Sequence, residues 1–305
     1  MTRSATVSFN NWIHFGWQGI EWQMPEDWTL GKIEGDRSSG YLRIDDEDMV
    51  RLEARWHVPK PESVDIEAEA EKQIKEVEKK SKKSKQKVVV KRRVKLIQRE
   101  RSAWECYQMR AEFHAWNLVN HCQVCGRVIL LRLFHLPKEA DRELARRIFE
   151  SLIDHQEDCH DRWDVYGLTM SLPTSFELET PSLKTGEIHL QFKKGRELLT
   201  GRRISLAEMQ LRELSLKQWT IKRCEADWKK FRWHLEESKF RAHEACLVSG
   251  RARITRQVWS PLSPKALKSR VWYCKDSDKL FILHALMKDE ESGLFEQVCE
   301  SIHCH

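Results

Sequence analysis

Two ten-residue stretches decide how this chain is organised. Cys122–Leu131 reads CQVCGRVILL, and Cys274–Leu283 reads CKDSDKLFIL. The two align without a gap, and each begins with a cysteine and ends in an apolar run, as a turn followed by a buried strand does. Further along, Ile148–Leu152 (IFESL) aligns with Val298–Ile302 (VCESI), and both predict a closing helix. Both ends of one pattern therefore occur twice.

Earlier segments repeat in the same order. Gly19–Pro25 corresponds to Gly167–Pro173, and Gly40–Ile44 corresponds to Gly186–Leu190. Each alternates apolar and polar residues, which is typical of a half-buried strand. Four matches in one order predict an internal duplication.

The matched segments predict two tandem, related domains, residues 1–160 and 161–305. In the first domain, Ile66, Ala70, Ile74 and Val77 recur at helical spacing and predict a helix with one apolar face.

The second domain is predicted to contain a much longer, Trp-rich helix. Ser205 and Glu208 have the spacing of a capping box, and we expect the helix to run to about Glu237. Its apolar residues include a set spaced seven apart: Leu214, Ile221, Trp228 and Leu235. Such a seam packs either along the sheet of its own domain or against a partner helix, which would make a self-associating structural protein.

Each half thus reads as strands, helix, strands and closing helix, which predicts an α+β class with an antiparallel sheet flanked by helices. This order of elements resembles the PsbP-like fold, named for the extrinsic photosystem protein. The resemblance implies domains used mainly for binding. It rests on element order rather than a motif, so it assigns no functional residue.

Composition excludes several classes of protein. The chain has 305 residues, 40% of them hydrophobic and 33% charged, so it is neither collagen-like nor largely disordered. Its nine cysteines are scattered and odd in number, unlike a secreted disulfide framework. The first residues show no signal-peptide pattern, and the longest apolar run is too short for a membrane helix. We therefore expect a cytoplasmic protein.

Most of the thirteen tryptophans fit core positions, whereas Trp12 and Trp17 are expected to be partly exposed.

The clearest charge feature is the basic segment Lys72–Lys95, which contains twelve Lys or Arg and two Glu. It carries ten net positive charges, more than the +6 of the whole chain. From Val88 onward the pattern predicts a strand with cations along one face, which would neutralise successive phosphates of a nucleic acid or another polyanion. An acidic protein surface is an alternative partner, and a solvated tract without a ligand is another. The predicted binding residues are Lys79, Lys80, Lys82, Lys83, Lys85, Lys91, Arg93 and Lys95.

The segment His121-Cys122-x-x-Cys125 resembles one half of a structural zinc site, because two thiolates three residues apart can bind one ion. Further ligands would come from the histidines and cysteines at 155–160 or 303–305. A redox pair and ordinary reduced cysteines are the alternatives, and the repeat has Ser277 where Cys125 stands.

No motif for catalysis occurs: the sequence lacks GxSxG, GxxxxGK[ST], GxGxxG and HExxH. The sequence therefore predicts a non-enzymatic binding or adaptor protein, possessing a polyanion surface at Lys72–Lys95. A small-molecule or hydrolytic site in a groove between the two domains is the alternative from another class.

Overall fold

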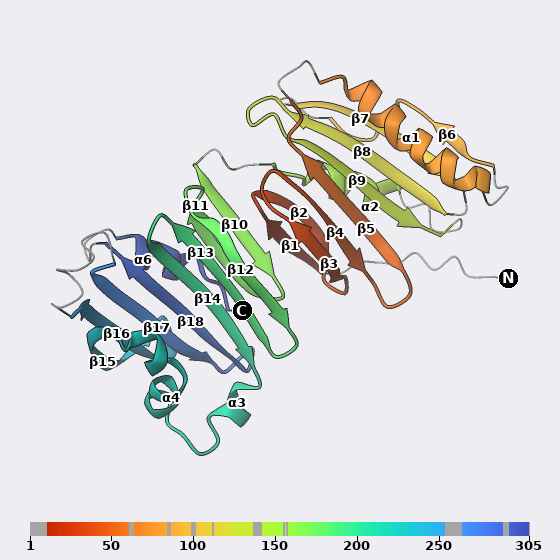
Figure 1. Cartoon of the computed structure of the whole chain (residues 1–305). Coiled ribbons are helices and arrows are strands. Elements are labelled where there is room, and N and C mark those ends of the chain that lie inside the picture. Colours follow the sequence, from red (N-terminus) through yellow and green to blue (C-terminus); the bar gives the residue numbers. More distant parts are fainter. Residues whose placement is uncertain are drawn as a thin grey trace, which may run out of the picture. The chain divides into compact units, whose positions relative to one another are not determined.

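A computed structural model describes residues 11–60, 64–83, 87–98, 102–111, 113–136, 142–154, 156, 158–253, 264–288 and 293–304. The chain divides into two compact units, Met1–Glu157 (unit 1) and Asp158–His305 (unit 2). Each unit has a β-hairpin, a seven-stranded antiparallel sheet and helices. Figure 1 shows these elements with their labels.

Unit 1 begins with a hairpin and continues into the seven-stranded sheet. Its strands are β1 (Trp12–Trp17), β2 (Ile20–Pro25), β3 (Thr29–Gly35), β4 (Ser39–Asp45), β5 (Val50–His57), β6 (Val89–Lys91), β7 (Ser102–Arg110), β8 (His114–Cys122) and β9 (Val128–His135). Its helices are α1 (Ile66–Lys83) and α2 (Arg142–Glu150).

Unit 2 repeats this plan. Its strands are β10 (His160–Val165), β11 (Leu168–Pro173), β12 (Glu177–Lys184), β13 (Glu187–Lys194), β14 (Glu197–Ser205), β15 (Phe231–Phe240), β16 (His243–Ala252), β17 (Ala266–Cys274) and β18 (Lys279–Met287). Its helices are α3 (Ala207–Gln210), α4 (Leu216–Trp228) and α6 (Leu294–Ser301).

The two seven-stranded sheets have corresponding strand orders, β3-β4-β5-β9-β8-β7-β6 and β12-β13-β14-β18-β17-β16-β15. In unit 1 the last strand, β9, lies between β5 and β8, and in unit 2 the last strand, β18, lies between β14 and β17. The helices correspond as well: α1 packs on β7 and β8, and α4 packs on β15, β16 and β17. Each closing helix packs on its unit's hairpin, α2 on β2 and α6 on β11. The segments that align in sequence therefore occupy equivalent places in the two units.

The predicted α+β class is wrong, because the structure is mostly β, with 53% strand and 19% helix. Strand β15 accounts for part of the difference, because most of its residues were predicted to be helical. Within the described residues, no helix is long and apolar enough to cross a membrane.

The long helix predicted for the second domain is wrong in its bounds. Helix α4 begins after Ser215, whose side chain and that of Gln218 form the capping box, and it ends at Trp228. Residues Phe231–Phe240 form strand β15, which pairs with β16 along its whole length. Leu235 is therefore on a strand, and the seven-residue spacing does not lie on one helix.

The tryptophans mostly pack in the cores, as their apolar neighbours predicted. Trp56, Trp163, Trp228 and Trp272 are among the largest fully buried side chains. Trp17 is also buried, so its predicted exposure is wrong.

Candidate functional site

Helix α1 is held to unit 1 by one apolar face. Ile66, Ala70, Ile74 and Val77 are buried against β7, β8 and β9. Because an α-helix advances by 100° per residue, the residues two positions from each buried one lie on the opposite face of α1 and point to solvent. The packing of the core therefore decides which side chains of α1 face outward.

The outward face of α1 carries a row of lysines. Lys72, Lys75, Lys79 and Lys82 follow one another at intervals of three or four residues, and all four are exposed. Such spacing places one ammonium group about every 5 Å along the helix. Among the described carboxylates, Glu71 alone lies within ion-pair distance of this row, 3.9 Å from the Nζ of Lys75. We call these four residues the lysine face of α1.

The strand part of the predicted basic surface does not form as expected. Strand β6 covers only Val89–Lys91, and the backbone turns at Arg93, which has a φ of 51°. Arg93 then donates to Glu67 of α1 at 2.8 Å, and its neighbour Arg92 pairs with Glu71. These guanidinium groups fasten the segment to the helix rather than forming a free row of cations.

The structure places the predicted binding residues in different settings. Lys79, Lys80 and Lys82 are exposed on α1, Lys91 ends β6 and is exposed, and Lys95 is exposed on the loop that follows. Lys83 is the last residue of α1, and Lys85 lies outside the described residues. Lys72 and Lys75 were missed as individual ligands, although their spacing opposite the apolar residues of α1 is visible in the sequence.

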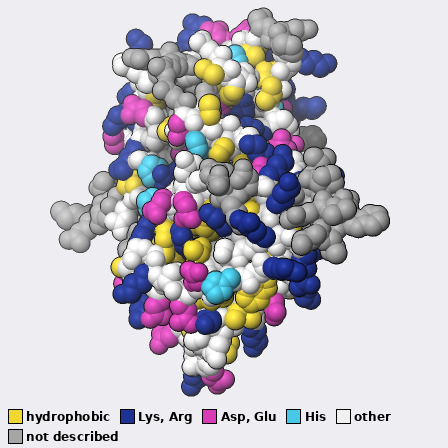
Figure 2. All heavy atoms as spheres, turned by 90° about the vertical axis from the view of Figure 1, so that its left-hand side faces the viewer, with side chains coloured by type: hydrophobic (Ala, Val, Ile, Leu, Met, Phe, Trp, Pro, Cys, Tyr) yellow, Lys and Arg dark blue, Asp and Glu magenta, His cyan; other side chains and the backbone are white. Residues whose placement is uncertain are grey.

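The face of the molecule drawn in Figure 2 has charges of both signs and can be compared with the lysine face of α1. In Figure 2, Lys and Arg side chains are interspersed with Asp and Glu, with hydrophobic side chains between them. A face of mixed sign is typical of solvation. The lysine face of α1 has its four lysines in one row, with Glu71 and the exposed Glu76 beside them.

The predicted zinc segment forms the turn between β8 and β9. Cys122 ends β8, and its backbone N–H donates to the carbonyl of Arg127 at 3.0 Å. Gly126 has a φ of 74°, a conformation that a residue with a side chain rarely adopts. The turn places Cys122 in the interior and leaves Cys125 exposed.

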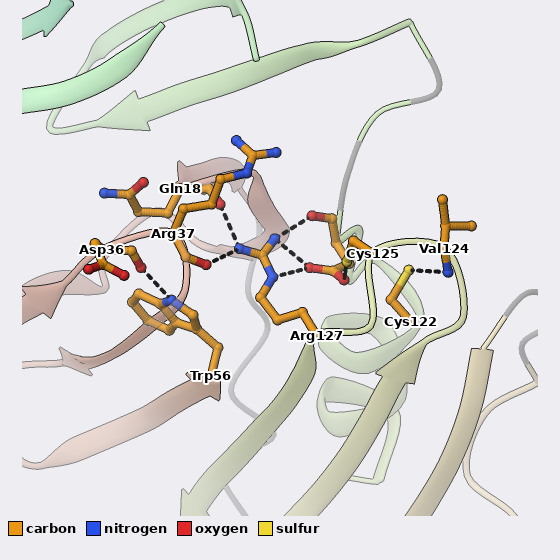
Figure 3. Close-up of polar contacts among 9 residues, drawn as sticks. Gln18, Asp36, Arg37, Trp56, Cys122, Val124, Cys125 and Arg127 are labelled. Carbon is orange, nitrogen blue, oxygen red and sulfur yellow. Dashed lines mark hydrogen bonds and ion pairs between the residues drawn. The ribbon is translucent and has the colours of Figure 1, made fainter. Parts of the chain in front are cut away.

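Arg127 organises this turn (Figure 3). Its guanidinium donates to the carbonyls of Gln18 at 2.9 Å and Arg37 at 3.2 Å. It also donates to the carboxylate and the carbonyl of Asp154, at 2.6 Å in each case. Asp154 follows α2, so this one side chain joins the hairpin, the β3–β4 turn and the end of the unit. Arg127 and Asp154 were not among the predicted site residues.

The two thiols of the turn differ in acidity. Cys125 donates to Oδ2 of Asp154 at 2.8 Å, and Cys122 accepts from the backbone N–H of Val124 at 3.4 Å. The hydrogen bond with Cys125, followed by those from backbone N–H groups, lowers the pKa of Cys122 to about 6. The hydrogen bonds with Cys122 and Asp154 and the charge of the Asp154 carboxylate raise the pKa of Cys125 well above its usual range. The arrangement therefore favours a thiolate at Cys122 beside a thiol at Cys125.

The ligand-type side chains of this turn are Cys122, Cys125 and Asp154, whose donor atoms lie within 4.8 Å of one another. His121 is not in that group, because adjacent residues of a strand point to opposite faces of the sheet. Asp154 already accepts from Arg127, and a cation in contact with the carboxylate opposes the entry of a second one. Of the predicted zinc ligands, the structure therefore brings Cys122 and Cys125 together and leaves His121 outside the group, and the zinc site stays a prediction.

Unit 2 also has a polar hollow of about 910 Å³ on its sheet, lined by residues that include Arg202, Asp227 and His284. Arg202 and Asp227 are 3.4 Å apart. Burial lowers the pKa of His284 to about 4, so its imidazole is neutral at pH 7.

Comparison with known proteins assigns no family. No protein-family model matches the chain, and no curated protein matches it. Among solved structures, it is similar to the immunity protein TplEi of T6SS from Pseudomonas aeruginosa complexed with "L" peptide, with 10% identity, a TM-score of 0.32, and coverage of 97% of this chain and 99% of that chain. The apo structure of TplEi gives 9% identity, a TM-score of 0.30, and coverage of 97% and 98%. Likenesses this weak carry no argument about function. The resemblance to the PsbP-like fold stays a prediction.

Proposed function

We propose that this protein is a non-enzymatic binding protein that docks a polyanion, with nucleic acid as the favoured class, on the lysine face of α1. One observation carries the proposal. Four exposed lysines lie in a row on a helix whose opposite face is buried against the sheet, so the row has a fixed geometry. A fixed row loses less conformational freedom on binding than a solvated, disordered tract would.

The expected physics is release of counterions. Each ammonium group that neutralises a DNA phosphate frees condensed cations, so affinity falls as salt rises, with a slope of about −0.9 per phosphate contact. A helix presenting four lysines would contribute up to about four such contacts. Binding through this face is therefore expected to be strongly salt-dependent and nearly independent of base sequence.

The test is binding of mixed-sequence single- and double-stranded RNA and DNA at several salt concentrations. The test variant is Lys72→Gln/Lys75→Gln/Lys79→Gln/Lys82→Gln. A matched control removes the same charge from unit 2, where the exposed residues Lys222, Lys229, Lys230 and Lys239 are available for substitution by Gln.

We expect the test variant to lose affinity and most of the salt slope, while the control keeps both. Equal losses in the two variants would show that only net charge matters, and would contradict a site on α1. If the intact protein binds no nucleic acid at low salt but binds polyglutamate, the partner is an acidic protein surface.

We also propose a cytoplasmic location. All nine cysteines are free thiols in the structure, which is usual for a reducing compartment.

A further inference from the structure

Unit 2 brings three metal-binding side chains together from distant parts of the chain. His243 begins β16, Cys274 ends β17, and Cys304 lies beyond α6. The antiparallel register pairs Glu244 with Tyr273, so the preceding His243 and the following Cys274 are neighbours at the same end of the two strands. The segment after α6 then lays Cys304 against both.

The cluster is close-packed and shielded from water. Nε2 of His243 lies 3.3 Å from Sγ of Cys304, and all three donor atoms lie within 4.8 Å of one another. The exposed fractions are 7% for His243, 0% for Cys274 and 9% for Cys304. Around a tetrahedral Zn²⁺ with ordinary Zn–N and Zn–S bonds, neighbouring ligand atoms are roughly 3.5 to 3.8 Å apart. Small side-chain movements are therefore enough to bring the three donor atoms to these distances.

We propose that His243, Cys274 and Cys304 form a binding site for a thiophilic divalent ion, with Zn²⁺ as the expected occupant. One imidazole and two thiolates are soft or borderline donors, which select zinc over magnesium or calcium. The three side chains supply three of the four tetrahedral positions. Binding releases the protons of both thiols.

The equivalent place in unit 1 shows what the ion would do. Cys274 aligns with Cys122, and Cys304 aligns with Asp154 when the closing helices are superposed by sequence. In unit 1 the segment after the closing helix is fastened to the sheet by the Arg127–Asp154 ion pair. In unit 2 a thiol replaces that carboxylate, and a bound ion would supply the electrostatic link that the ion pair supplies in unit 1.

Neighbouring contacts hold the third ligand in position. The guanidinium of Arg241 donates to the carbonyls of Ile302 at 2.9 Å and Glu300 at 2.7 Å. These bonds fix the backbone immediately before Cys304. A pre-positioned ligand set binds metal more tightly than a flexible one, because less freedom is lost on binding.

The experiment titrates Co²⁺ into the full chain under reducing, anaerobic conditions and follows the thiolate-to-cobalt charge-transfer band. A Cys122→Ser/Cys125→Ser background removes the thiol pair of unit 1. We expect this background to bind one Co²⁺ per chain and Zn²⁺ to displace it. Adding His243→Ala, Cys274→Ser or Cys304→Ser is expected to weaken binding at least 100-fold, on the order of 3 kcal/mol.

A matched control is Cys299→Ser, which removes another buried thiol of unit 2 from outside the cluster. It is expected to leave Co²⁺ affinity unchanged. Far-UV circular dichroism of each metal-free variant checks that the unit still folds. The proposal is overturned if the folded background shows no charge-transfer band, or if a folded Cys304→Ser variant keeps the affinity. It is also overturned if the reduced protein takes up no ion and Cys274 and Cys304 form a disulfide in air.

Discussion

Arg127 donates to both the carboxylate and the backbone carbonyl of Asp154, at 2.6 Å in each case, and both residues are buried. Removing one member of a buried pair leaves an uncompensated charge, which costs about 3–5 kcal/mol. We therefore expect Asp154→Ala to lower the free energy of unfolding of unit 1 by about that amount in urea titrations. The control is Glu143→Ala, which removes an exposed ion pair with Arg146 and should change the free energy of unfolding much less, because solvent screens that pair. Similar losses in the two variants would contradict a special role for Asp154.

The acidity of Cys122 predicts its chemistry. With a pKa of about 6, Cys122 is a thiolate at pH 7, and its reaction with a small alkylating reagent should rise with pH around 6. In Cys125→Ala the main hydrogen bond that favours the thiolate is lost, so the midpoint should move up toward 9. Mass spectrometry of labelled peptides measures both profiles. A midpoint that stays near 6 in Cys125→Ala would show that another group sets the acidity.

His284 predicts a pH-dependent loss of stability. Its folded pKa of about 4 lies below the ordinary value of 6.5, so the unfolded state binds a proton more readily. The contribution of neutral His284 to the free energy of unfolding is complete above pH 6.5. It is lost as the pH falls toward 4, by up to about 3 kcal/mol. Urea titrations from pH 7 to 4 should show a smaller loss for His284→Gln than for the unchanged protein. The control His234→Gln alters an exposed side chain and should follow the unchanged protein.

The burial of Trp228 predicts that the packing of α4 on the sheet stabilises unit 2. Its ring is fully buried in the core of unit 2 and lies 5.2 Å from that of Trp233. Trp228→Ala should lower the free energy of unfolding by about 3–5 kcal/mol. Trp12→Ala removes a half-buried ring beneath Arg147, and about 1 kcal/mol is expected there. A cost for Trp228→Ala as small as that expected for Trp12→Ala, measured by chemical denaturation, would mean that α4 contributes little to the core.

Much of the local structure could be predicted from the sequence. Alternation of apolar and polar residues indicated the strands at Gly19–Pro25 and Gly167–Pro173, which the structure has as β2 and β11. The spacing of Ile66, Ala70 and Ile74 indicated α1. These signals are readable because each depends on which face of a single element is buried.

The error over Phe231–Phe240 shows the limit of such patterns. Phe231 and Leu235 are buried on β15 at a spacing that also fits a helix, and the preceding residues are helical. The strand exists because its backbone hydrogen-bonds to β16 in a ten-residue register, which no local spacing reports.

The sequence by itself determined the repeated order of elements and the buried face of α1, because hydrophobic periodicity acts within a few residues. Only the tertiary structure decided the sites. His243 and Cys304 are 61 positions apart in the chain, yet strand register and the segment after α6 bring them to 3.3 Å. Asp154 meets Arg127 and Cys125 in the same way. Such contacts depend on inter-strand hydrogen bonds and packing across the whole unit, which a linear pattern of residues does not encode.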